Sequence, residues 1–405
     1  MKIMQINCVY RSGSTGKIVF DIHTALKERG IESVVCYGRG KKIRDEKVYK
    51  TCGEFEGKLN NLISRITGFS YGGCFFATNR LLNRIKKEKP DVVHLHCING
   101  FFVNIYRLVT FLKKNNIPTV LTHHAEFFYT ANCGYAFECE NWKSGCGKCP
   151  SVKRAVRSYF FDFTKSNFKK MKKAFAGFEN MISAAVSPWV QQRAEMSPIF
   201  TDKKNTTVLN GIECSVFAPC GDREKLKSEL GVLPDKNVIV HVTADFDDPR
   251  KGGKYIRQLA EKLGDDVVIL VVGNRETPTD LPKNIIALGR VENQKKLAEY
   301  YSMADLSLIA SKRETFSMPV AESLCCGTPV VGFEAGGPES ITIPEFSEFV
   351  EYGNTEKLCE TTLKMLDSDI DRGNIAQKAA EKYSKEAMAK GYIKLYEEVL
   401  ATTMI

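Results

Sequence analysis

Short apolar runs that alternate with helical periods occur twice along this chain of 405 residues, and this repetition constrains the fold most strongly. Runs rich in Val, Ile and Leu, about four to eight residues long, are typical of strands buried on both faces. Parallel strands need a helix-length crossover between them, so each set predicts a parallel sheet covered by helices. The sequence therefore predicts an α/β protein with two Rossmann-like lobes that face a cleft.

The first set predicts a lobe over residues 1–204, completed by a last helix within 385–405, and the second set predicts a lobe over residues 205–384. The polar stretch Asn205–Pro219 is expected to join them. The expected strands are Lys2–Val9, Glu32–Tyr37, Asp91–His96, Thr119–Thr122, Asn237–Thr243, Val267–Gly273, Ile285–Leu288, Leu306–Ala310 and Pro329–Phe333. The expected helices are Ile18–Glu28, Asn79–Lys89, Ile105–Asn115, Tyr255–Leu263, Gln294–Met303, Pro319–Cys325 and Lys385–Leu400.

The formal net charge of +10 is distributed unevenly between the halves of the chain. Residues 1–200 contain 32 Lys and Arg against 15 Asp and Glu, whereas residues 201–405 contain 26 against 33. The basic half favours an anionic partner. No apolar run approaches the roughly 20 residues of a membrane span, and the first residues lack the apolar core of a secretion signal. We therefore expect a soluble protein whose 14 cysteines do not form a disulfide framework.

The segment Ser311–Glu322 is the most informative for function. It follows an expected strand, and Pro319 favours the first turn of a helix. Free backbone N–H groups at a helix start can hold a diphosphate. Glu314 lies before this helix and Glu322 one turn inside it, so two carboxylates could accept hydrogen bonds from the hydroxyls of a nucleotide sugar. The alternative is that one carboxylate interacts with the helix dipole at the N-terminus and the other glutamate is simply solvated.

Around these residues the sequence resembles glycosyltransferase family 4, a group of retaining sugar transferases with the GT-B fold. The family's E-x7-E motif matches Glu314 and Glu322, and its following glycine and proline run matches Gly327, Pro329 and Gly336-Gly337. Further matches follow one another in the family's order along most of the chain. They are Ser12–Lys17, Asp91–His96, Thr122–His124, Leu209–Glu213 with Phe217, and Pro249–Gly253.

The resemblance implies roles for particular residues. It makes His124, Glu314 and Lys251 the catalytic residues, with His123 as a rival to His124 because a one-residue shift reverses the face of a strand. It implies a donor site in which Glu322 binds the ribose and Lys251 holds the diphosphate. That site comprises Arg250, Lys251, Phe316, Ser317, Met318 and Glu322, and the loop for the acceptor or a phosphate comprises Gly13, Ser14, Thr15 and Gly16.

The implied activity is retaining transfer of a sugar from a nucleoside-diphosphate donor to a lipid-linked or oligosaccharide acceptor of surface polysaccharide synthesis. Catalysis would need no cofactor or metal ion, because Lys251 and helix N–H groups supply positive charge. The implied location is the cytoplasmic face of the plasma membrane, as a peripheral protein. Two alternatives remain open, a nucleotide-sugar epimerase of the same fold and a non-catalytic, degenerate transferase that binds sugars. The non-catalytic alternative is raised because the glycine that usually follows E-x-F in the family is replaced here by Ser317.

Four cysteines, Cys133, Cys139, Cys146 and Cys149, lie close together in the sequence. A C-x2-C pair followed by proline, with glycines for tight turns, suits a tetrahedral thiolate site. A subset of the family that acts on surface polysaccharides has a similar cysteine-rich insert. The pattern predicts a structural zinc site, and the alternatives are free thiols or a redox-labile pair.

The stretch Val152–Phe175 contains eight basic residues, one acid and six aromatic residues in what we expect to be a helix. This composition favours contact with an anionic membrane surface, and the alternative is a lobe helix with a solvated charged face. No recognition motif supports nucleic acid as a partner. His94 and His96 share one face of an expected strand, which favours packed or cleft-lining histidines over metal ligands.

Overall fold

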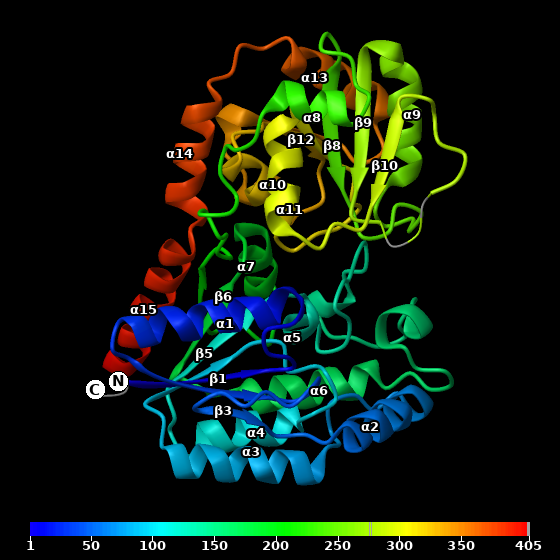
Figure 1. Ribbon diagram of the computed structural model, residues 1–405. Helices are drawn as coiled ribbons and strands as arrows, with labels where there is room; N and C mark the ends of the chain where they lie inside the picture. Colours follow the sequence, from blue (N-terminus) through cyan, green and yellow to red (C-terminus); the bar gives the residue numbers. More distant parts are fainter. Residues whose placement is uncertain (275, 277, 403–405) are drawn as a thin grey trace. The chain divides into compact units, whose positions relative to one another are not determined.

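The computed structural model describes residues 1–274, 276 and 278–402 and divides the chain into two compact units (Figure 1). Unit 1 begins at Met1, runs to Leu209 and resumes at Met388, and unit 2 comprises Asn210–Ala387. The sequence placed these boundaries after residues 204 and 384. The difference arises because residues 204–207 form a strand that pairs with the sheet of unit 1.

Unit 1 contains a seven-stranded sheet in the order β3-β2-β1-β4-β5-β6-β7, and every neighbouring pair is parallel. Its strands are β1 (Lys2–Asn7), β2 (Glu32–Tyr37), β3 (Val48–Lys50), β4 (Val92–Leu95), β5 (Thr119–His123), β6 (Met181–Ala185) and β7 (Lys204–Thr207). Its helices are α1 (Gly13–Glu28), α2 (Glu54–Thr67), α3 (Phe75–Glu88), α4 (Ile105–Lys114), α5 (Phe127–Thr130), α6 (Thr164–Phe175), α7 (Pro188–Glu195) and most of α15 (Lys385–Ala401).

Helix α15 completes the core of unit 1, as its amphipathic pattern predicted. Tyr392, Tyr396 and Val399 are buried in one cluster with residues of α1, β1 and β4. The hydroxyl of Tyr396 is hydrogen-bonded to Nδ1 of His94 at 2.7 Å, so a strand and a helix 302 residues apart share a buried polar contact.

Unit 2 contains a six-stranded parallel sheet in the order β10-β9-β8-β11-β12-β13. Its strands are β8 (Asn237–Val242), β9 (Val267–Val272), β10 (Ile285–Gly289), β11 (Leu306–Ile309), β12 (Val330–Phe333) and β13 (Ser347–Val350). Its helices are α8 (Arg223–Glu229), α9 (Gly253–Leu263), α10 (Gln294–Met303), α11 (Met318–Cys325), α12 (Gly337–Ile341), α13 (Thr355–Leu366) and α14 (Arg372–Tyr383).

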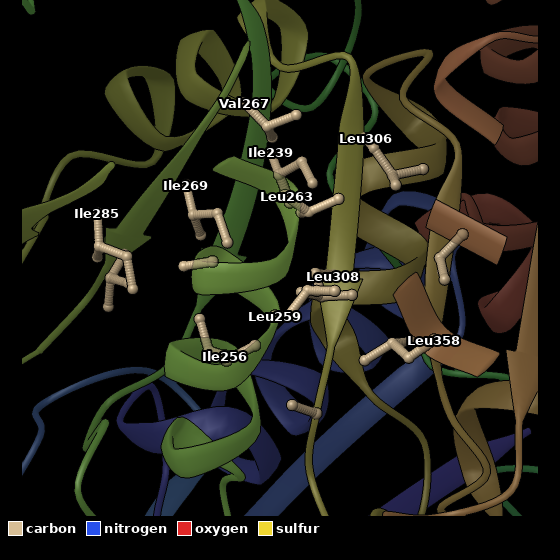
Figure 2. Packing of buried hydrophobic residues seen from close by; sticks show 14 of the residues in the cluster. Ile239, Ile256, Leu259, Leu263, Val267, Ile269, Ile285, Leu306, Leu308 and Leu358 are labelled. Carbon is tan, nitrogen blue, oxygen red and sulfur yellow. The ribbon is translucent and has the colours of Figure 1, made fainter. Parts of the chain in front are cut away.

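One face of this sheet is closed by α9 and α13, whose apolar stripes meet the strands. Figure 2 shows Ile256 and Leu259 of α9 beside Ile239 and Leu308 of the central strands, and all four are fully buried. Since apolar residues on α9 recur at helical spacing while the strands are apolar on both faces, this core follows directly from the sequence pattern.

The expected helix over Val152–Phe175 is not continuous. A short π-helical turn covers Val152–Val156, and α6 begins only at Thr164. Arg157 ends the turn in a left-handed conformation with φ of 58°, and the carboxylate of Asp162 accepts hydrogen bonds from the backbone N–H and the hydroxyl of Thr164. The intervening segment therefore lies outside any helix.

Among the residues that the structure describes, no helix is long and apolar enough to cross a bilayer.

All six histidines of the chain have pKa values below the ordinary range, and burial is the main cause in each case. Burial lowers the pKa of His23 to about 4, with Nδ1 bonded to the hydroxyl of Ser33 at 2.8 Å. Burial likewise lowers the pKa of His241 to about 4. The folded protein therefore takes up protons at these sites less readily than the unfolded chain does.

We expect the free energy of unfolding to change little between about pH 7 and 8 and to fall as the pH drops from about 6.5 towards 4. Each histidine contributes at most about 1.4 kcal/mol per pH unit, because the unfolded chain binds a proton that the folded state excludes. Denaturant unfolding at a series of pH values measures this dependence. The variant His23→Gln should show a shallower slope, and an unchanged free energy between pH 7 and 5 would contradict the prediction.

Candidate functional site

The sheet of unit 2 reverses its strand order next to β8, which has β9 on one side and β11 on the other. Ligands of open parallel sheets bind beyond the carboxyl ends of the strands at such a point. The loop after β8 leads to α9 and carries Arg250 and Lys251, and the loop after β11 leads to α11 and carries Glu314. The structure therefore brings the predicted donor residues of the two loops to one edge of the sheet.

An ion pair links the two loops. Nζ of Lys251 donates a hydrogen bond to Oε1 of Glu314 at 2.6 Å, and both side chains remain partly exposed. The backbone supports this contact, because the N–H of Lys312 donates to the carbonyl of Arg250 at 2.8 Å. The guanidinium of Arg250 pairs with the carboxylate of Asp248 and holds the pKa of Asp248 below its usual range. The side chain of Lys251 thus bridges the two loops, whereas the side chain of Arg250 binds Asp248 on its own loop.

Two glycines allow these loops to approach closely. Gly252 has φ of 78°, and a Cβ placed on it would lie 2.1 Å from the carbonyl oxygen of Ala310. A Cβ on Gly337 would lie 2.5 Å from the carbonyl carbon of Thr315. The carboxylate of Glu339 fixes the second contact by accepting hydrogen bonds from the N–H groups of Ala335 and Gly336 at 3.0 and 2.6 Å. These positions require glycine because backbone packs directly on backbone.

Helix α11 begins as the sequence predicts, with Pro319 in its first turn. Its N-cap residue is Ser317, which is buried and has φ of 78° without a side-chain capping hydrogen bond. Met318 is partly exposed at the helix start, whereas Phe316 is only 3% exposed. Phe316 therefore anchors the loop in the core instead of presenting its ring to a ligand. Position 317 favours glycine, because glycine adopts a positive φ without the steric cost that serine carries.

Glu322 lies one turn inside α11 and is partly exposed. The hydroxyl of Tyr301, on α10, donates a hydrogen bond to its Oε2 at 3.3 Å. Burial, together with the nearby carboxylate of Glu322, raises the pKa of Tyr301 well above its ordinary value. Tyr301 therefore remains a donor that orients Glu322. The role of Tyr301 could not be predicted from the sequence, because a single aromatic residue in a predicted helix does not indicate which residue it contacts.

Unit 1 has its own reversal of strand order, between β1 and β4. The loop after β1 leads to α1, where Gly13 has φ of 64° and is exposed together with Ser14. Gly16 is buried, and the hydroxyl of Thr15 accepts a hydrogen bond from Nδ2 of Asn7 at 3.4 Å. The predicted glycine loop therefore forms the start of α1, with exposed backbone at the carboxyl edge of this sheet.

Two histidines that follow β4 and β5, His96 and His124, meet at the same edge of the sheet of unit 1. Nδ1 of His96 and Nε2 of His124 are 3.0 Å apart, so one ring donates a hydrogen bond to the other. Burial lowers the pKa of His124 to about 4. His123 points the other way, is fully buried against Phe200 and is bonded to the hydroxyl of Ser183 at 2.8 Å. Of the two rivals, His124 is the one that reaches the partly exposed side.

The cysteine-rich insert is held by a buried carboxylate. Glu126 accepts hydrogen bonds from the N–H of Ala136 at 2.5 Å and from Nε of Arg193 at 2.8 Å. Burial raises the pKa of Cys133 and of Cys146 to about 12, so both thiols are protonated. Within residues 1–274, 276 and 278–402, no three His, Cys, Asp or Glu side chains are grouped so that they could hold a metal ion.

Comparisons with known proteins agree with this architecture. Residues 15–176 match the family model described as Glycosyltransferase Family 4, and residues 222–382 match the one described as Glycosyl transferases group 1. The chain is 22% identical to the putative colanic acid biosynthesis glycosyl transferase WcaC of Escherichia coli K12, over 98% of this chain and 100% of that one.

Among solved structures, the chain resembles sucrose-phosphate synthase of Thermosynechococcus elongatus, with a TM-score of 0.67, 14% identity and coverage of 99% of this chain and 100% of that one. It also resembles Anabaena Alr3699/HepE in complex with UDP and glucose, with a TM-score of 0.63, 15% identity and coverage of 98% and 99%. These likenesses establish the fold, two Rossmann-like lobes of the GT-B type.

We expect Ser317→Gly to raise the free energy of unfolding by up to about 1 kcal/mol, because glycine adopts a positive φ without the steric cost that serine carries. Ser317→Ala retains the strained backbone and serves as the matched control, with no such gain. Denaturant unfolding of both variants measures the effect. A Gly variant that is no more stable than the Ala variant would contradict the assigned strain.

The zinc prediction from the cysteine spacing stays a prediction, and metal analysis checks it. Protein with a structural site, purified without chelator, would carry about one zinc ion per chain. A content below about half an equivalent would reject the site.

Proposed function

Because this chain belongs to glycosyltransferase family 4 and has the GT-B fold, we propose that it transfers a sugar, with retention of configuration, from a nucleoside-diphosphate donor to a lipid-linked saccharide acceptor. The observation that carries the proposal is the ion pair between Lys251 and Glu314 at the strand-order reversal of unit 2. This ion pair supports the proposal, because a cation suits the diphosphate of a nucleotide sugar and a carboxylate suits its hydroxyl groups. Glu322 lies on the adjoining helix α11.

The donor's diphosphate is proposed to replace Glu314 as the partner of Lys251. The ammonium group then lies against the phosphate oxygens, on which negative charge accumulates as the glycosidic bond breaks. The N–H groups at the start of α11 add partial positive charge on the same side. Glu314, released from the lysine, accepts a hydrogen bond from a hydroxyl of the transferred sugar. Glu322, oriented by Tyr301, accepts hydrogen bonds from the ribose.

This arrangement assigns the rate enhancement to positioning and to stabilisation of the leaving group. Retention is proposed without a covalent enzyme intermediate, and Lys251 with the helix start is proposed to take the place of a divalent metal ion. His124 is proposed to contact the transferred sugar as a neutral imidazole, since burial lowers its pKa to about 4.

The acceptor is proposed to be a lipid-linked saccharide of a surface polysaccharide. Two observations support this proposal. The relative from Escherichia coli is described as a colanic acid biosynthesis enzyme. The basic excess of residues 1–200 suits a phosphate-bearing acceptor on the cytoplasmic face of a membrane.

Lys251→Met should lower kcat by about 10²- to 10³-fold, because a charge that acts on the leaving group is removed. Glu322→Gln should weaken binding of the nucleotide. The matched control is Lys254→Met, which removes an exposed lysine three residues further along the same segment. Mass spectrometry of products from a panel of nucleotide sugars, incubated with lipid extract, measures transfer, and calorimetry with UDP and GDP measures binding.

Full transfer activity in Lys251→Met would contradict the assigned role of the lysine. Conversion of the nucleotide sugar to an epimer without any acceptor would instead identify an epimerase. Nucleotide binding without turnover across the panel would identify a sugar-binding protein that lacks catalysis.

A further inference from the structure

Helix α2 presents its large apolar side chains to the outside of the molecule. Five of them recur at a spacing that puts them on one face of a helix. Their exposed fractions are 80% for Phe55, 44% for Leu59, 52% for Leu62, 46% for Ile63 and 42% for Ile66. A surface helix of a globular domain normally turns such residues inward. The amphipathic pattern of α2 is therefore inverted with respect to the core of unit 1.

The inner side of α2 is small and polar. Gly57 and Ser64 are its buried residues. The carboxylate of Glu56 accepts hydrogen bonds from the N–H of Ala77 at 2.9 Å and from Nη2 of Arg80 at 2.8 Å. Oδ1 of Asn60 accepts one from the N–H of Cys74 at 2.8 Å. These polar contacts fix the orientation of the helix, so its apolar side chains are held facing outward.

The segment between the π-helical turn and α6 extends this apolar surface. The N–H of Tyr159 donates to the carbonyl of Arg65, at the end of α2, at 2.7 Å, and Nη1 of Arg65 donates to the hydroxyl of Tyr159 at 3.1 Å. Tyr159, Phe160 and Phe161 are 51%, 73% and 55% exposed. We call the five α2 residues and these three aromatic residues the apolar face. Figure 1 shows α2 at the end of unit 1 away from the chain termini.

The charged side chains beside the apolar face are mostly basic, with Asp162 as an exposed acid next to Phe161. The two acids of α2 are neutralised within unit 1, since Glu54 pairs with Arg39 and Lys50, and Glu56 pairs with Arg80. Exposed lysines flank the face on α2 and on α6, and they are Lys58, Lys165, Lys169 and Lys170.

A pocket of about 440 Å³ opens where α2 meets the segment that precedes Tyr159. Arg39, Arg65 and Arg157 line it, together with the polar residues Asn61 and Ser64. The Arg39 guanidinium is already paired with Glu54, so Arg65 and Arg157 are the residues that supply net positive charge for a phosphate group, which arginine binds through paired hydrogen bonds. An apolar surface and an adjoining cationic pocket match the two parts of a phospholipid, its acyl chains and its phosphate.

We propose that the apolar face inserts into the surface of an anionic lipid bilayer and that the arginine pocket receives a lipid phosphate. The inference rests on the proposed function, since it supplies the membrane at which a lipid-linked acceptor is met. A second copy of the chain is a less favourable occupant, because two copies of the same lysine-flanked surface would repel each other. Aromatic and basic residues together are typical of helices that lie in a bilayer interface.

The test uses the full chain and sedimentation with vesicles of phosphatidylcholine alone or mixed with phosphatidylglycerol. The protein should sediment with the mixed vesicles and release at high salt. Combining Phe55→Ser, Leu62→Ser and Phe160→Ser should weaken binding at least about tenfold, because apolar insertion is lost. Arg157→Gln should weaken binding to the anionic vesicles, and it leaves in place the hydrogen bond from Arg65 to Tyr159 of the apolar face.

Leu233→Ser provides a matched control, because Leu233 is 59% exposed in unit 2 and should leave vesicle binding unchanged. Far-UV circular dichroism and cooperative thermal unfolding check that each variant is folded, because the substitutions in the apolar face and the pocket lie in unit 1 whereas the nucleotide is proposed to bind unit 2. An unchanged unfolding transition with lost vesicle binding supports the proposal. If the unaltered protein bound vesicles but no nucleotide, that result would contradict the proposed function and would still support the apolar face as the membrane-binding surface.

Three outcomes would overturn the inference. The unaltered protein would fail to bind mixed vesicles, or it would bind neutral vesicles equally well, or the serine variant would bind as tightly as the unaltered protein. Analytical ultracentrifugation adds a fourth, a dimer that the serine substitutions dissociate, which would assign the apolar face to a second copy of the chain.

Discussion

The close packing of two loops against each other in unit 2 is the constraint on which the candidate site depends. Gly252 lies where a Cβ would meet the carbonyl oxygen of Ala310, and Gly337 lies similarly against Thr315. Only backbone fits in these spaces, so the loop after β8 and the loop after β11 are held at a fixed separation. That separation lets Lys251 reach Glu314, and it leaves both groups partly exposed to a ligand. The proposed chemistry therefore depends on glycine at positions 252 and 337, where no side chain fits.

Much of the fold could be predicted from the sequence, because apolar runs report burial directly. The helix predicted over Gln294–Met303 has the same bounds in the structure, and the predicted strand Leu306–Ala310 differs by one residue. Elements that depend on polar contacts were missed. Strand β7, over Lys204–Thr207, has no fully buried residue, and α2 is held by hydrogen bonds that the side chains of Glu56 and Asn60 accept. Periodicity identifies apolar faces, but it cannot tell whether a face points inward or outward.

The candidate site was predictable to the extent that local sequence determines it. The placement of Glu314 before α11 and Glu322 inside it followed from Pro319 and the preceding strand. Contacts between distant segments were not predictable, because neither partner carries a mark of the other. The hydrogen bonds between Tyr301 and Glu322 and between His96 and His124 are of this kind. The positive φ at Ser317 likewise could not be predicted from the residue type, since serine rarely adopts a left-handed backbone conformation.

The return of α15 to unit 1 has a consequence for how the chain matures on the ribosome. Unit 1 is assembled from residues synthesised first and from residues synthesised after all of unit 2. At about 5–20 residues per second, translation of unit 2 takes on the order of ten seconds or more. During that interval the nascent amino-terminal sheet lacks Tyr392, Tyr396 and Val399, and the imidazole of His94 lacks its phenol partner. Unit 1 therefore stays incomplete until translation of α15, whereas unit 2, which is continuous in sequence, can fold as it emerges from the ribosome.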